Sequence, residues 1–226
     1  MGKPTLAYFG IGKEDEPMTT LLTADQLELG RDLPLKFGQL EGFVPGEGAP
    51  DPLFVVVSEA PGKVEARVGH PFQGPAGTTL DQWFAQLGVT RDQLYLTGAV
   101  RSRPYTVGPT GLKRDRKPTQ AEVIASAPLL DAELQLLAGH LLVPLGNTGL
   151  QRLLGSATKI GTVHGQLLER PIRYWDADSA RFKLTATTYP IFPLFHPSYA
   201  RRFKKVRPMV TADLAALKAY LTAHQA

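Results

Sequence analysis

LFVVVSEAPGKVEARVGHPFQGPAGTTLD, residues Leu53 to Asp81, begins with an apolar, β-branched run and breaks at Ser58 into a loop rich in glycine and proline. Such a run is typical of a strand that a sheet buries on both faces. The amphipathic segment Thr78 to Leu87 then predicts a helix. In an open α/β sheet, ligands bind beyond the carboxyl ends of the strands, so we expect the site at this strand, loop and helix.

The rest of the chain repeats this alternation of short apolar runs and longer periodic segments. Further strands are predicted at residues 94–97, 141–145, 183–187 and 191–195, and further helices at 23–29, 119–137, 148–154 and 208–223. Residues 166–168 and 172–174 are predicted to form a small hairpin. The alternation indicates an α/β fold, with a mostly parallel sheet and helices on both faces. We expect residues 1–48 to be a partly irregular lead-in that packs on one domain, residues 49–226.

Composition excludes several classes of protein. No apolar run approaches the ~20 residues that a membrane span needs, and the first residues lack a targeting signal, so we expect a cytoplasmic protein with no membrane contact. The chain has no cysteine, which removes disulfides, iron-sulfur clusters and thiolate metal sites. No close pairing of histidines with carboxylates supports a metal site, and we expect no cofactor.

Charge is unevenly distributed along the chain. Residues 1–100 hold 7 Lys and Arg against 13 Asp and Glu, whereas residues 101–226 hold 18 against 8. A basic surface is what a nucleic-acid binder needs, because contacts with phosphates release condensed counterions. A solubilising surface with a chance asymmetry is the alternative.

Two candidate residues lie in the opening stretch. Glu59 directly follows the buried strand, and although a carboxylate in a turn is often only solvated, Ala60 and Pro61 make a small, stiff loop that a ligand can approach. Phe72 lies in the segment Gly69 to Gly77. Its ring can plug the core, but an aromatic face near a carboxylate is also what a flat heterocycle needs for stacking.

The remaining candidates lie in the basic half. His196 ends an apolar run, which puts an imidazole at the same sheet edge as Glu59 if the strands are parallel, although a lone histidine is more often structural. Five basic side chains follow within residues 201–207. Residues 101–117 form a predicted long loop with six basic residues, which can be solvated or can clamp a DNA backbone.

Several motifs, taken in order, resemble the uracil-DNA glycosylase superfamily, and its family 4 branch in particular. They are SEAPG, GHPFQGPAG, LYLTGAVRSRPY, KPTQAE, LLVPLGNTGLQRLLG, the His-Gly pair at 164–165 and HPSYARR. The resemblance covers residues 49–220. It implies a three-layer α/β/α sandwich around a short, mostly parallel sheet, and hydrolysis of the N-glycosidic bond of a base flipped out of DNA.

The resemblance also implies roles for individual residues. Glu59 would orient or activate water, Phe72 would stack on the flipped base, and His196 would hydrogen-bond a base oxygen as negative charge develops there. Ala60, Pro61 and Gly98 would complete the base pocket. The residues expected to bind DNA are Ser198, Tyr199, Arg201, Arg202 and Lys204, together with Lys113, Arg114, Arg116 and Lys117.

Departures from the family pattern bear on the cofactor and the substrate. The four cysteines that hold an iron-sulfur cluster in family 4 correspond to Ser102 and Ser126 and to positions near Gly30 and Leu33, so we expect no cluster. The asparagine that reads uracil corresponds to Gly98, which should weaken discrimination or widen the pocket. The loop at residues 105–118 has no histidine, so covalent trapping of the product is not expected.

We therefore expect a monofunctional DNA glycosylase, a monomer that acts on uracil or another deaminated base in base excision repair. One alternative is a DNA-binding protein of the same fold that has lost the chemistry. The other is a hydrolase of free nucleosides or nucleotides, which would not need the basic residues.

Overall fold

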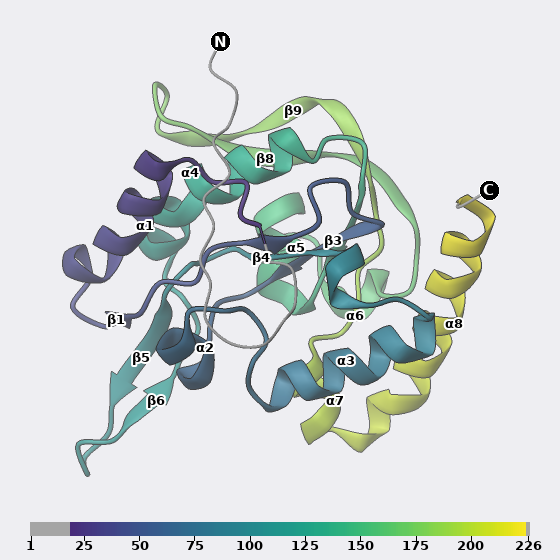
Figure 1. Cartoon of the computed structure of the whole chain (residues 1–226), viewed down its shortest axis with the longest axis horizontal. Coiled ribbons are helices and arrows are strands. Elements are labelled where there is room, and N and C mark those ends of the chain that lie inside the picture. Colours follow the sequence, from purple (N-terminus) through teal and green to yellow (C-terminus); the bar gives the residue numbers. More distant parts are fainter. Residues whose placement is uncertain (1–18, 225–226) are drawn as a thin grey trace.

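The computed structural model describes residues 19–224 and contains a central six-stranded sheet (Figure 1). Its strands are, in spatial order, β2 (Glu47–Gly48), β4 (Tyr95–Gly98), β3 (Phe54–Ser58), β7 (Leu141–Pro144), β9 (Arg181–Ile191) and β8 (Leu168–Asp176). The four inner strands are parallel, and each edge strand is antiparallel to its neighbour. The predicted mostly parallel sheet is thus confirmed.

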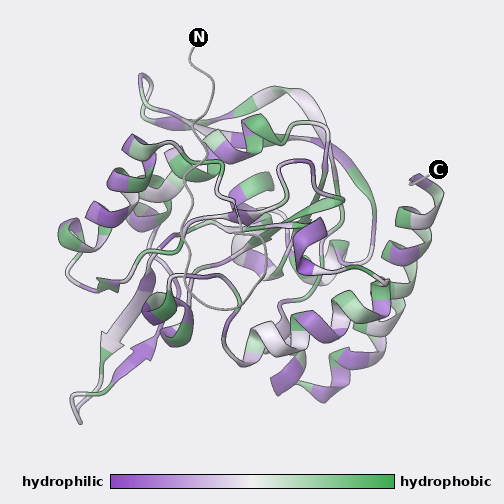
Figure 2. Cartoon of the chain, in the orientation of Figure 1, coloured by the Kyte–Doolittle hydropathy of each residue, from purple (hydrophilic) through white to green (hydrophobic). Residues whose placement is uncertain are grey.

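Helices cover both faces of the sheet, which gives the three-layer sandwich. Because side chains alternate along a strand, Phe54 and Val56 of β3 point to one face while Val55 and Val57 point to the other. The first face packs on α3 (Pro75–Leu87) and α8 (Arg207–His224). The second packs on α4 (Gln120–Leu136) and on Leu153 of α5 (Gly146–Leu154). Figure 2 shows hydrophobic residues gathered on the central strands.

Local sequence signals explain where the helices start. Thr119 and Glu122 form the expected capping box: the Glu122 carboxylate accepts from the Thr119 backbone N–H at 2.7 Å, and the Thr119 hydroxyl accepts from the Glu122 N–H at 3.3 Å. Thr23 likewise caps α1, but this helix runs over Ala24–Lys36 instead of ending at residue 29. It continues through Pro34 because Leu27 and Leu33 bury against α4.

The predicted hairpin at residues 166–174 is wrong. Residues 168–174 belong to one strand, β8, which pairs with β9 in a long hairpin that turns after Asp176, and residues 166 and 167 precede that strand. The Asp176 carboxylate accepts from the Ser179 backbone N–H at 3.1 Å and so fixes the turn. The strand predicted at 183–187 lies within β9, but of the strand predicted at 191–195 only Ile191 belongs to β9, and beyond it Leu194 forms an isolated parallel bridge with Leu145. β9 tolerates Pro190 because it pairs with β7 only at Ile191.

The prediction of a long basic loop at residues 101–117 is also wrong, because part of this segment is regular structure. It contains a hairpin of β5 (Arg103–Val107) and β6 (Lys113–Asp115), and β5 pairs with β1 (Leu40–Glu41). Arg103 is buried and donates to Glu41 and, at 2.5 Å, to Asp115. The hairpin protrudes from the body in Figure 1 and is hydrophilic along β6 in Figure 2. Ion pairs between distant segments therefore order this part of the chain.

Short helices complete the fold. They are α2 (Lys63–Val68), α6 (Ile160–Val163), α7 (Pro197–Arg202) and the 3-10 helices η1 (Arg91–Gln93) and η2 (Lys204–Val206). Of the helices within residues 19–224, none combines the length and apolar character required to cross a bilayer.

Candidate active site

A cleft of 1010 Å³ opens where the inner strands end. The predicted site residues that line it are Glu59, Ala60, Pro61, Phe72, Gly98, Arg116, Lys117, His196, Ser198, Tyr199, Arg201 and Arg202. Lys113, Arg114 and Lys204 do not line it. The parallel pairing of the inner strands is what brings the ends of β3 and of the segment after β9 to one edge.

Glu59 is fixed just beyond β3 by the neighbouring elements. Its backbone carbonyl accepts from the N–H of Val100 at 3.0 Å, and the hydroxyl of Thr148 on α5 donates to its carboxylate. One carboxylate oxygen thus has a donor, and the residue is half-buried at the cleft wall. No local pattern marks Thr148 as a partner of Glu59, because 89 residues separate the two.

Phe72 has a strained backbone, with a φ of 55°, and its side chain is buried. A non-glycine residue in this left-handed region costs about 1–3 kcal/mol and persists only where its surroundings hold it. Arg91 supplies that support: its guanidinium donates to the carbonyls of Pro71 and Phe72 at 3.2 and 2.7 Å. Asp81 in turn holds Arg91 at 2.7 Å. Arg91 is a positioning residue that no local motif marks.

Replacing Arg91 with alanine should raise KM for a damaged-base substrate by about tenfold, with a smaller change in kcat. The variant loses the charged donors that hold the Phe72 backbone, so the ring no longer stays at the position where the sequence predicts that it stacks on a base. Steady-state kinetics measure the split. Asp81→Ala is the matched control, since it removes the ion pair and keeps the bonds from Arg91 to the loop. Equal KM values for wild type and Arg91→Ala would contradict this account.

Glu65 joins the two loops that carry Glu59 and Phe72. This buried carboxylate on α2 accepts from the backbone N–H of Gly62 at 3.1 Å and of Gly74 at 2.8 Å. The SEAPG and GHPFQG segments are therefore fixed to each other through one side chain. The predicted elements did not include α2, which is only six residues long.

His196 is held in one tautomer by the helix that follows it. Its Nδ1 accepts from the backbone N–H of Ser198 at 3.2 Å and lies 2.8 Å from the Ser198 hydroxyl, which can also donate to it. The proton of the neutral imidazole then resides on Nε2. Burial lowers the pKa of His196 to about 4, and the nearby positive charge of Arg202 acts in the same direction. At neutral pH the cleft therefore contains an uncharged imidazole that can donate a hydrogen bond from Nε2.

The lowered pKa predicts how activity and stability vary with acidity. Between the ordinary histidine pKa of 6.5 and about 4, the unfolded chain binds a proton at His196 that the folded chain does not. Stability from this group is present above pH 6.5 and is lost as the pH falls toward 4. The rate of base release should show no acid limb near 6.5. An NMR titration of the His196 ring checks the assignment, and a midpoint near 6.5 would contradict it.

Gly98 ends β4 beside Ser58 of β3. A Cβ at position 98 would lie 2.9 Å from the Ser58 hydroxyl oxygen, which would have to rotate away. Both residues line the cleft. The hydroxyl of Ser58 is thus a polar group at the place where the family pattern has an amide, and the predictions from sequence did not include it.

The basic residues predicted to bind DNA differ in whether a carboxylate already forms an ion pair with them. Arg116 donates to both oxygens of Glu122 at 2.8 and 2.6 Å, and these bonds raise the pKa of its guanidinium. Lys113 pairs with Glu41. By contrast, Lys117 and Arg201 are exposed, and no carboxylate pairs with either among the described residues.

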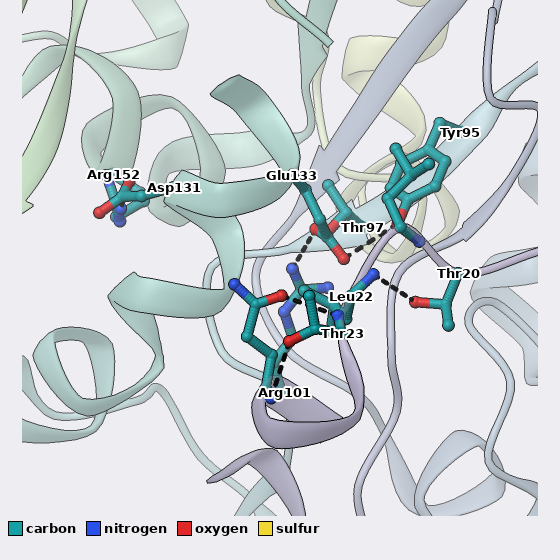
Figure 3. Close-up of polar contacts among 11 residues, drawn as sticks. Thr20, Leu22, Thr23, Tyr95, Thr97, Arg101, Asp131, Glu133 and Arg152 are labelled. Carbon is teal, nitrogen blue, oxygen red and sulfur yellow. Dashed lines mark hydrogen bonds and ion pairs between the residues drawn. The ribbon is translucent and has the colours of Figure 1, made fainter. Parts of the chain in front are cut away.

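A buried ion pair lies behind the cleft (Figure 3). Glu133 accepts from the hydroxyls of Tyr95 at 3.0 Å and Thr97 at 2.6 Å, and from the guanidinium of Arg101. Glu133 and Arg101 are 0% and 1% exposed. Arg101, which was expected in the basic loop, is therefore part of the interior. Through Glu133 it is joined to Thr97, and both residues contribute to the wall of the cleft.

The positions that correspond to the family's cluster cysteines are packed as ordinary core. Gly30 and Leu33 lie on α1, where a Cβ at Gly30 would lie 2.1 Å from the Phe43 ring. Ser102 and Ser126 are fully buried, and their hydroxyls have no hydrogen-bond partner among the described residues. These residues offer no thiolate and do not fit an iron-sulfur cluster. Nor do three or more His, Asp or Glu side chains of residues 19–224 gather into a metal site.

Comparisons with known proteins agree with the motifs. The sequence model of the uracil DNA glycosylase superfamily matches residues 45–218. A type-4 uracil-DNA glycosylase of Sulfurisphaera tokodaii is 29% identical over 77% of this chain and 73% of its own. One of Pyrobaculum aerophilum is 31% identical over 72% of this chain and 78% of its own, and one of Thermotoga maritima is 29% identical over 79% and 82%.

Proposed function

The chain belongs to the uracil-DNA glycosylase superfamily, and we propose that it is a monofunctional DNA glycosylase that removes uracil or another deaminated base. The observation that carries this proposal is the tautomer of His196, a residue that lines the cleft and whose Nδ1 is occupied as an acceptor, which leaves a neutral Nε2–H donor. Such a donor suits a leaving base, because its hydrogen bond strengthens as negative charge develops on the base oxygen.

In the proposed reaction, the base flips out of the DNA into the cleft and stacks on Phe72. The bond between the sugar C1′ and the base nitrogen breaks, and the electron pair leaves with the base, whose oxygen accepts from His196. Water, oriented by the carboxylate of Glu59, adds at C1′ and gives up a proton. The products are a free base, which takes a proton from solvent, and an abasic site in an uncut strand.

The interior packing supports a protein that works without the family's cluster. The Phe43 ring over Gly30 and the leucines that α1 buries against α4 hold together the segments that the cluster would join. A protein without the cluster is therefore part of this proposal.

Base choice is proposed to be broader than in relatives with the amide. Gly98 has no side chain to pair with the edge of uracil, and Ser58 offers a hydroxyl that can both donate and accept. Hypoxanthine and xanthine are candidate substrates besides uracil.

A substrate panel tests the proposal. Labelled single strands and duplexes that contain uracil, hypoxanthine or xanthine are incubated with the protein and then treated with alkali, which cuts at abasic sites. We expect alkali-dependent cleavage of at least one of them. Tight, salt-dependent binding of the damaged DNA with no cleavage would instead select the alternative of a DNA-binding protein, which the absence of an amide at Gly98 favours.

A further inference from the structure

Four aromatic rings contact one another in a row that runs from the interior to the exposed end of α7, and the middle pair is stacked. We call this row of rings the aromatic ladder. Ring centroids are 4.4 Å apart for His164 and Phe195, 5.9 Å for Phe195 and Tyr199, and 4.5 Å for Tyr199 and Phe203. Phe195 is buried, whereas Tyr199 and Phe203 are 36% and 42% exposed. The two outer rings are large apolar groups that the fold leaves in contact with water.

The inner end of the ladder is fixed. The Nδ1 of His164 lies 2.8 and 3.0 Å from the two carboxylate oxygens of Asp213, which is buried. Phe195 and Tyr199 are nearly parallel, with 17° between their planes. The outer rings therefore have a preset orientation, so a ligand that stacks on them need not order them first.

Basic residues that have no carboxylate partner within residues 19–224 flank the two outer rings in the sequence. Arg201, Arg202, Lys204, Lys205 and Arg207 are exposed, and in the part of the chain that the structure describes none of them pairs with a carboxylate. Exposed aromatic rings among unpaired cations match the chemistry of a strand of nucleic acid, which alternates flat bases with phosphates.

The ladder also has a direction relative to the cleft. Tyr199 lines the cleft, whereas Phe203 lies outside its lining and contacts Tyr199 with 40° between the ring planes. A strand whose flipped nucleotide occupies the cleft would pass over Tyr199 and then Phe203. In a duplex without a flipped base, stacked neighbours cover the faces of every internal base, whereas a single strand offers free base faces along its length.

We propose that Tyr199 and Phe203 are a stacking platform for an unpaired base beside the flipped nucleotide, and that this platform makes the protein prefer single-stranded DNA to intact duplex. The position of the flipped nucleotide rests on the proposed function. The stacking itself does not, because it can be measured on DNA without a damaged base.

The test is the affinity of Phe203→Leu for fluorescein-labelled oligothymidylate, measured by fluorescence anisotropy. Leucine keeps an apolar side chain of similar reach and removes the ring. We expect about tenfold weaker binding of the single strand and less than about twofold weaker binding of an undamaged duplex. Because stacking releases no counterions, the ratio between wild type and variant should stay constant as salt is raised.

Two further variants make the result specific. Phe203→Trp keeps a ring and should bind as wild type does, and Leu184→Ala removes an apolar side chain on β9 that is still more exposed, at 60%, and should change nothing. Unfolding curves verify that each variant folds. Unchanged binding of oligothymidylate by Phe203→Leu, or an equal loss on single strand and duplex, would overturn the platform. A substrate panel without base release would overturn the proposed function and leave this binding result standing.

Discussion

Replacing His196 with alanine should lower the rate of base release by about 10²–10³-fold while DNA affinity changes little. In the proposed reaction, the Nε2–H donor gains most of its interaction only as charge develops on the leaving base, so its loss is expected to raise the free energy of the transition state and not to weaken binding. The backbone N–H of Ser198 selects the donor tautomer, and the lowered pKa keeps the ring neutral at physiological pH. Single-turnover kinetics with saturating protein separate this effect from binding.

A matched variant separates chemistry from structure at this position. His196→Gln keeps an amide donor of similar reach and should recover part of the lost rate. Anisotropy with the same duplex measures affinity for wild type and both variants. Equal losses of rate and affinity in His196→Ala would identify a structural histidine.

Replacing Glu133 with alanine should reduce the free energy of unfolding by about 3–5 kcal/mol. The variant leaves the guanidinium of Arg101 buried without its carboxylate, and the hydroxyls of Tyr95 and Thr97 lose their acceptor. Removing one partner of a buried pair is costly because the other charge stays out of water. Urea denaturation measures the change.

Two controls show that burial is the cause. Asp51→Ala removes a pair with His140 in which the carboxylate side chain is 96% exposed, and it should cost about 1 kcal/mol or less. Replacing both Arg101 and Glu133 with methionine should recover part of the stability, since no charge then stays unpaired. A Glu133→Ala variant as stable as Asp51→Ala would show that the pair contributes little.

Local patterns were sufficient to predict the parallel sheet and the common edge of its strands. The apolar run before Ser58 and the capping box at Thr119 are short-range signals, and the structure confirms the strand and the helix start that they predicted. The apolar runs at residues 141–145 and directly before His196 carry the same kind of short-range signal. Parallel pairing then brings Glu59 and His196 to one cleft, as predicted.

Interactions between distant residues explain what the sequence did not reveal. The basic hairpin is ordered by Glu41, which is 62 residues from Arg103 and 72 from Lys113. Phe72 is held by Arg91, and Glu59 by Thr148, again across long separations. The turn after Asp176 did have a local signal, since an aspartate followed by Ser179 can close a turn. The prediction instead placed the turn at residues 169–171, because Pro171 is also typical of turns.

The most direct test of the central account is mass-spectrometric detection of the free base released from DNA that contains a deaminated base. If the protein is a monofunctional DNA glycosylase, we expect free base in amounts equal to the abasic sites formed, in a strand that stays intact until alkali is added. DNA that is bound with no free base released, or a strand that is cut without alkali, would contradict it.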